Sequence, residues 1–118
     1  MNSPLLDKSL DFATQIVLFY ETFSKTKKDT TIAKQLLRSA TSIGANINEA
    51  IYGNSKADFI SKLQIALKEC YETEYWLELI QKSEIFTDDI LKSLLHDCGA
   101  IRRMLISSIN TTKSNTGN

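Results

Sequence analysis

Apolar residues recur along the chain at helical spacing in four segments, which short polar stretches separate. The second segment runs from about Thr31 to Tyr52 and stops at Gly53, a residue type that commonly ends helices. Its apolar positions alternate steps of four and three: Leu36, Ala40, Ile43, Ile47 and Ala50. This heptad pattern is typical of helices that pack in a bundle.

The first segment predicts a helix from about Pro4 to Ser24. Ser3 can cap this helix, and Pro4 suits the first helical position. The residues that we expect to face the core are Leu6, Leu10, Ile16, Val17, Tyr20 and Phe23.

The third and fourth segments begin with capping signals. Ser55 opens the third with a capping box, and Thr87 followed by Asp88 and Asp89 opens the fourth. The third carries the seam Phe59, Leu63, Ala66, Cys70, Thr73, Leu77 and Ile80, with a second stripe of Ile60, Leu67 and Tyr71. The fourth carries Ile90, Leu94, Cys98, Ile101, Leu105 and Ile109.

The expected fold follows from the short connections between the long helices. Helices joined by short loops pack antiparallel, so the sequence predicts an all-α, up-down-up-down antiparallel four-helix bundle over residues 1–110. A single proline and four glycines agree with so few turns. The chain from Asn110 onward, NTTKSNTGN, has no apolar side chain to bury, so we expect a disordered tail over residues 111–118.

The composition narrows the function classes. The formal net charge is zero, whereas a non-specific nucleic-acid binder usually has an excess of lysine and arginine. No apolar run approaches the ~20 residues that a membrane span requires. The N-terminal residues lack the pattern of a secretory signal, so we expect a cytoplasmic protein with reduced cysteines.

Catalytic and metal sites have few candidate residues here. A di-iron bundle needs Glu-x-x-His motifs, but His96 is the only histidine and no glutamate stands three residues before it. His96 and Met104 are wrongly spaced for opposite haem ligands. Cys70 and Cys98 should lie at the same height, as small buried residues or alternatively as a disulfide. We therefore predict no enzyme, no metal, no cofactor and no small-molecule substrate.

The second helix carries a polar stripe beside its apolar seam: Ser39, Ser42, Asn46 and Glu49. Gly44 lies inside this helix, where it costs about 1 kcal/mol relative to alanine, and it indicates close approach by another helix. The stripe is either a solvated surface, or a subunit contact or polar network between helices. On the second interpretation, the candidate oligomer interface comprises Ser42, Gly44, Asn46, Asn48, Glu49 and Trp76. Trp76 and its neighbour Tyr75 suit a core or a subunit interface better than nucleobase stacking.

Charge is segregated although the total is neutral. The candidate patch for nucleic acid or an acidic partner comprises Lys25, Lys27, Lys28, Lys34 and Arg38 near the first turn, with Arg102 and Arg103 further along. Acidic residues gather near the third turn: Glu69, Glu72, Glu74, Glu78, Glu84, Asp88 and Asp89. Both turns should lie at one end of the bundle. This arrangement suits head-to-tail contact between copies in a ring, or equally a set of solvated helix ends.

Two segments resemble a known family. LLRSATSIGANINEA, residues 36–50, and SKADFISKLQIALKECYETEYWLELI, residues 55–80, resemble the bacterial four-helix-bundle family named for proteins encoded in intervening sequences of 23S rRNA genes. The string from Ser42 to Glu49 is the most specific part, and the resemblance extends from about Leu6 to Ile109. It implies a homopentamer without established enzymatic activity. Accessory variability proteins of diversity-generating retroelements, a related branch, bind nucleic acid but are strongly basic, unlike this chain.

These observations lead to two hypotheses about function. The first is a non-enzymatic, homo-oligomeric binding or scaffold protein, pentameric by resemblance and associated with RNA or a ribonucleoprotein. The alternative is a protein-binding adaptor ring without nucleic-acid contact, whose acidic turn faces a basic partner.

Overall fold

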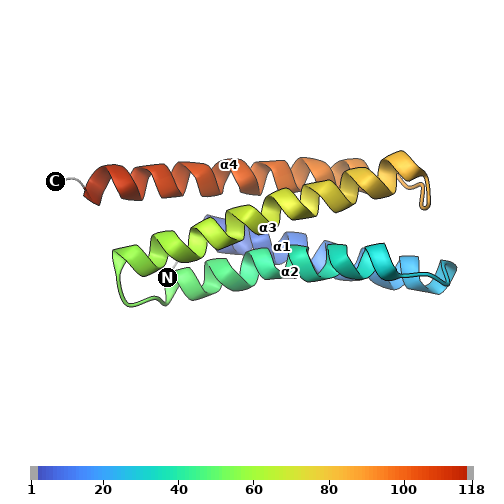
Figure 1. Ribbon diagram of the computed structural model, residues 1–118, viewed down its shortest axis with the longest axis horizontal. Coiled ribbons are helices and arrows are strands. Elements are labelled where there is room, and N and C mark those ends of the chain that lie inside the picture. Colours follow the sequence, from blue (N-terminus) through green and yellow to red (C-terminus); the bar gives the residue numbers. More distant parts are fainter. Residues whose placement is uncertain (1–2, 117–118) are drawn as a thin grey trace.

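The computed structural model describes residues 3–116, which form four helices and no strand. The helices are α1 (Pro4–Thr26), α2 (Thr31–Ile51), α3 (Lys56–Ser83) and α4 (Ile90–Thr116). Each helix packs on the next, and α4 returns to α1, within a rod of 53 × 22 × 22 Å. Figure 1 shows the α1–α2 and α3–α4 connections at one end of the rod and the α2–α3 connection at the other. The predicted all-α four-helix bundle is confirmed.

The capping signals predicted for the first and third helices are confirmed, whereas α4 begins at Ile90, whose amide donates to Asp88 Oδ1 at 3.0 Å in place of the predicted Thr87. Ser3 Oγ accepts a hydrogen bond from the amide of Leu6 at 3.2 Å, and Ser55 Oγ accepts one from Asp58 at 3.1 Å. Both bonds satisfy amides that the first helical turn leaves without a partner. At the other end of α3, Glu84 adopts a left-handed conformation with φ of 58°, a common way to end a helix.

The core follows the predicted seams of the last three helices. Every seam residue predicted for them is buried, except Phe59 and Ile90, which are half-buried. Leu91 joins the α4 seam as an addition. Aromatic rings extend the core at the end of the rod where the α1–α2 and α3–α4 connections lie. There the Phe86 ring contacts the rings of Phe19 and Phe23, with centroid distances of 5.2 and 5.3 Å.

The predicted core face of α1 is wrong in part. The buried residues of α1 are Ser9, Phe12, Ile16, Phe19 and Phe23. Leu10 and Val17 are instead exposed, and Leu6 and Tyr20 are half-buried. Two apolar seams run side by side on this helix, one residue apart. Aromatic rings bury more surface than Leu or Val, which favours the phenylalanine seam for the core.

The predicted tail also differs from the structure. Residues 111–116 continue α4 as helix, and residues 117–118 lie outside the described part. A helix that has started gains one hydrogen bond for each further residue, so it can continue without apolar side chains. The Thr112 hydroxyl donates to the carbonyl oxygen of Ser108 at 2.8 Å.

No helix within residues 3–116 has both the length and the hydropathy needed to cross a lipid bilayer.

Candidate functional site

The polar stripe of α2 makes its hydrogen bonds within this chain. Ser39 is fully buried and accepts a hydrogen bond from Thr73 Oγ1 of α3 at 2.9 Å. Asn46 is half-buried, and its Nδ2 donates to the carbonyl and hydroxyl oxygens of Ser42 at 2.9 and 3.1 Å. The part of the stripe nearest the seam therefore includes a polar link between α2 and α3, one of the two predicted arrangements.

The outer part of the stripe is open to solvent. Glu49 is exposed and pairs with Lys62 of α3 at 3.4 Å. Asn48 is also exposed, and its side chain makes no hydrogen bond to the described residues. An exposed ion pair of this kind contributes little to stability, about 0–1 kcal/mol.

Gly44 of α2 faces Ser9 of α1 at short distance. A Cβ atom at this position would stand 3.2 Å from Ser9 Oγ and 3.6 Å from Ser9 Cβ. Ser9 is fully buried, and its hydroxyl donates to the carbonyl oxygen of Leu6 at 2.8 Å. The predicted close approach is confirmed, and the approaching helix is α1 of the same chain.

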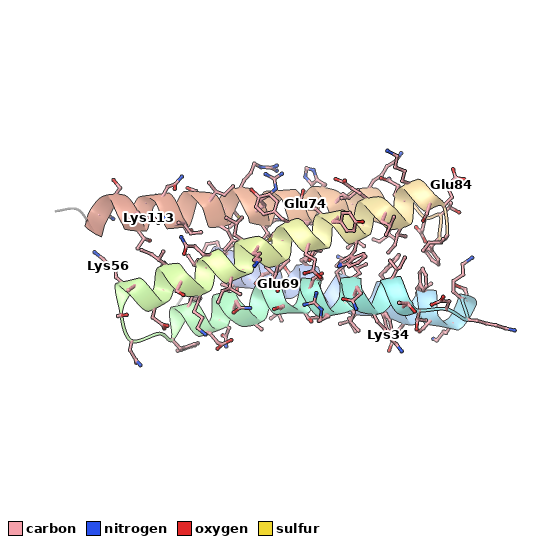
Figure 2. All side chains as sticks on the ribbon, viewed as in Figure 1. Lys34, Lys56, Glu69, Glu74, Glu84 and Lys113 are labelled. Atoms are coloured by element: carbon pink, nitrogen blue, oxygen red, sulfur yellow. The ribbon has the colours of Figure 1, made fainter. Side chains whose placement is uncertain are left out.

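Arg38 is held by acidic residues of α3. Its Nη2 pairs with Glu72 Oε2, and its Nη1 lies 3.5 Å from Glu69 Oε2. Trp76 Nε1 donates to the same Glu72 oxygen at 3.0 Å, and the Tyr75 ring packs edge-on against the half-buried Trp76. Figure 2 shows Glu69 halfway along the rod, between α3 and α2. Arg38 therefore lies in a locally acidic cluster.

The two arginines of α4 differ in whether they pair with an acidic residue. Arg102 Nε donates to Glu74 Oε1 at 2.7 Å, and its guanidinium lies 5.9 Å from the centre of the Tyr71 ring. The hydrogen bond to Glu74 is the main cause of the raised pKa of Arg102. Arg103 is exposed and has no ion pair among the described residues. Only one of the two predicted arginines is therefore available to a partner.

Four exposed lysines lie close together in the chain at the end with two connections. The basic corner comprises Lys25, Lys27, Lys28 and Lys34, all exposed and without an ion pair within residues 3–116. The acidic corner comprises Glu78, Glu84, Asp88 and Asp89, which are exposed and likewise unpaired in the described chain. Lys34 and Glu84 mark this shared end in Figure 2. The predicted segregation is confirmed, but its members nearer the middle pair with each other.

A second apolar surface runs along α1, and the sequence pattern predicts four of its five residues, all but Ala13, in the core. The α1 flank comprises Leu6, Leu10, Ala13, Val17 and Tyr20, at steps of four and three. All but Leu6 lie one residue beyond a buried position of α1, and one residue turns the helix by about 100°. The side chain of Leu10 is 64% exposed and that of Val17 is 43% exposed. The signal was present in the sequence, as a second heptad seam displaced by one residue from the phenylalanine seam.

The two cysteines are buried free thiols in contact. This agrees with the prediction of small buried residues and not with the alternative of a disulfide. Cys98 Sγ donates to the carbonyl oxygen of Cys70 at 3.6 Å. The pKa of Cys98 lies well above its usual range, first through its interaction with Cys70 and then through burial. His96 is exposed, and residues 3–116 contain no group of three His, Cys, Asp or Glu side chains placed to hold a metal ion.

The chain resembles known proteins in both sequence and structure. The family described as 23S rRNA-intervening sequence protein matches residues 2–107. A protein of unknown function from the S23 ribosomal protein family of Bacteroides thetaiotaomicron VPI-5482 has a similar crystal structure, with a TM-score of 0.85 and 50% sequence identity. The similarity covers 89% of this chain and 97% of that chain. No curated protein matches the sequence. Because the match spans nearly the whole bundle, the chain belongs to the 23S rRNA-intervening sequence protein family.

Proposed function

We propose that this chain is a non-enzymatic scaffold that assembles with copies of itself and presents its charged ends to a partner. The observation that carries the proposal is the α1 flank. Leu10 and Val17 stand one heptad apart, exposed, in line with three half-buried residues of the same flank. Large apolar side chains that repeat along one exposed stripe mark an interaction surface.

The spacing of the α1 flank favours a helix as its partner. Steps of four and three are the spacing of the buried seams in this bundle, and they fit the side of another helix. A second copy offers only helical surface along its length, so it meets this requirement. Contacts between different faces of identical copies close into a ring when the rotation permits, and the family resemblance favours five copies.

The self-association proposal is tested with charge placed on the α1 flank. The variant L10E/V17E should convert the assembly into folded monomers, because each glutamate would bury a charge in the contact. L18E is the matched control, since Leu18 is 58% exposed and lies outside the flank, about 100° from Val17 around α1. Native mass spectrometry reports the number of 13.3 kDa chains. An unchanged mass for L10E/V17E, or dissociation by L18E alone, would contradict the role of the flank.

RNA is the partner class that we propose for the basic corner. Its four lysines have no acidic partner among the described residues, and a closed ring would repeat them around one end. Phosphate contacts of this kind act through displaced counterions, so they weaken as salt increases.

A gel mobility shift with structured RNA tests the RNA proposal. We expect a shift at ~50 mM salt that disappears at ~200 mM, because electrostatic binding is strongest at low salt. K27E/K28E should abolish it, whereas the control K56E/K113E changes two lysines at the opposite end and should retain it. No shift at low salt would favour the alternative, an adaptor ring that binds protein through the acidic corner.

A further inference from the structure

A hollow of about 540 Å³ lies at the end of the bundle where both charged corners meet. It opens between the α1–α2 connection and the start of the α3–α4 connection. The residues that line it are Phe23, Lys27, Lys28, Asp29, Thr31, Ile32 and Ile85. Pockets for small organic molecules in proteins usually measure about 300–1,000 Å³, so the hollow has a suitable size.

The floor of the hollow is apolar and held in place by the core. Phe23 is buried against Phe86, with ring centroids 5.3 Å apart. Ile32 is half-buried in the first turn of α2. Ile85 is 36% exposed and follows Glu84, whose left-handed backbone turns the chain back over this end. Such a floor can take hydrocarbon, but it offers no side-chain donor to a bare inorganic anion.

The rim of the hollow is positive. Lys27 and Lys28 are exposed and form no ion pair with any described residue. The third charged residue, Asp29, accepts a hydrogen bond from the amide of Thr31 at 2.9 Å, and this bond lowers the pKa of Asp29. Asp29 is therefore bonded to the start of α2, and the two ammonium groups remain available to a ligand.

We propose that this hollow binds a small organic anion with an apolar body, such as a medium-chain carboxylate. The hydrocarbon would lie on Phe23, Ile32 and Ile85, and the carboxylate would meet the ammonium groups of Lys27 and Lys28. Neither half of the site is sufficient, because the floor recognises the body and the rim recognises the charge. This site goes beyond the proposed scaffold function and does not depend on self-association.

Titration with octanoate, followed by amide signals in ¹H–¹⁵N NMR spectra, tests the proposal. We expect saturable shifts at Thr31, Ile32 and Ile85, and no comparable shifts with inorganic phosphate or with neutral 1-octanol. K27Q/K28Q should weaken octanoate binding about fivefold to tenfold, the effect of losing two exposed charge contacts. The control K56Q/K113Q, at the opposite end of the rod, should bind octanoate like the unchanged protein.

A second variant tests the floor at constant charge. I85S shortens an exposed side chain outside the helices, so the bundle should remain folded. We expect it to weaken octanoate binding about fivefold, in line with the loss of one apolar contact surface. Absence of saturable octanoate binding, equal binding of phosphate or octanol, or binding that neither variant weakens would overturn the proposal.

Discussion

The α1 flank and the polar stripe of α2 each run beside the buried seam of their helix, yet they differ in the contacts that their side chains make. Within the stripe, Ser39 bonds to Thr73 and Asn46 bonds to its own helix. On the flank, Leu10 and Val17 have large exposed apolar surfaces. A polar stripe can satisfy itself within one chain through hydrogen bonds, whereas an apolar flank loses its contact with water only when another surface covers it. The flank is therefore the better candidate for contact between copies.

The largest expected effect separates the two seams of α1. Phe12→Ala should lower the free energy of unfolding by about 3–5 kcal/mol, because it removes a fully buried ring and leaves a cavity. Leu10→Ala should change it by no more than about 0.5 kcal/mol in a monomer, because Leu10 is mostly exposed. Urea denaturation, at protein concentrations low enough to give monomers, measures the free energy of unfolding of both variants. Equal losses would place the flank in the core.

The next effect concerns the contact between α1 and α2. Gly44→Leu should destabilise the bundle by about 1–3 kcal/mol, because its side chain would overlap the buried Ser9. Gly99→Leu is a matched change in α4, where a Cβ atom would meet the flexible ends of Arg103 and Arg102, at 3.4 and 3.7 Å. Thermal unfolding of the two variants gives the comparison. A neutral Gly44→Leu would show that α1 and α2 do not approach closely.

A smaller effect tests whether the stripe is satisfied internally. Thr73→Val keeps the shape of the side chain but removes a buried hydroxyl that lies 2.9 Å from Ser39 Oγ of α2 and 2.7 Å from the carbonyl oxygen of Glu69 in its own helix, so we expect a loss of about 1 kcal/mol. The control is Thr41→Val, which removes a hydroxyl bonded only to carbonyl oxygens of its own helix, Leu37 and Arg38. Chemical denaturation measures both variants. If Thr41→Val lowered the stability as much as Thr73→Val, the hydrogen bond between α2 and α3 would contribute no more than a bond within one helix.

The smallest effect is expected at the exposed ion pairs beside the stripe. Arg38→Gln should cost about 0.5 kcal/mol at low ionic strength, because the guanidinium is half exposed and solvent screens its two pairs. High salt should reduce the difference further. Melting temperatures at two ionic strengths measure it. A large loss that persists in high salt would mean that this cluster holds α2 and α3 together.

Much of the fold could be predicted from the sequence. In α2, α3 and α4 the predicted seams follow the heptad period, which identifies the buried side, although Tyr71 of the second stripe of α3 is 53% exposed. In α1 the period is ambiguous, because Leu10 and Val17 continue a second seam beside Phe12 and Phe19. Only the packing of the four helices decides between the two. The predicted end of α4 was too early for another reason. The apolar pattern predicts which residues are buried, but it does not predict where backbone hydrogen bonding stops.

The candidate surfaces could be predicted only in part. The sequence identified the charged residues and the close approach at Gly44. It could not show that Arg38 and Arg102 pair with glutamates 34 and 28 residues away, because such pairs depend on tertiary packing. It also gave no sign of the hollow beside Ile85, whose lining comes from two connections that are distant in the chain.

The most direct test of the central claim measures whether the α1 flank is covered in the assembled protein. Val17→Cys places a thiol on the flank, and Leu18→Cys places one on an exposed face about 100° around α1 from it. The natural cysteines are buried. Maleimide labelling should be about tenfold or more slower at position 17 than at position 18, because a covered side chain reacts only when the contact opens. Dilution to monomers should remove the difference. Equal labelling rates in the assembly would contradict the account.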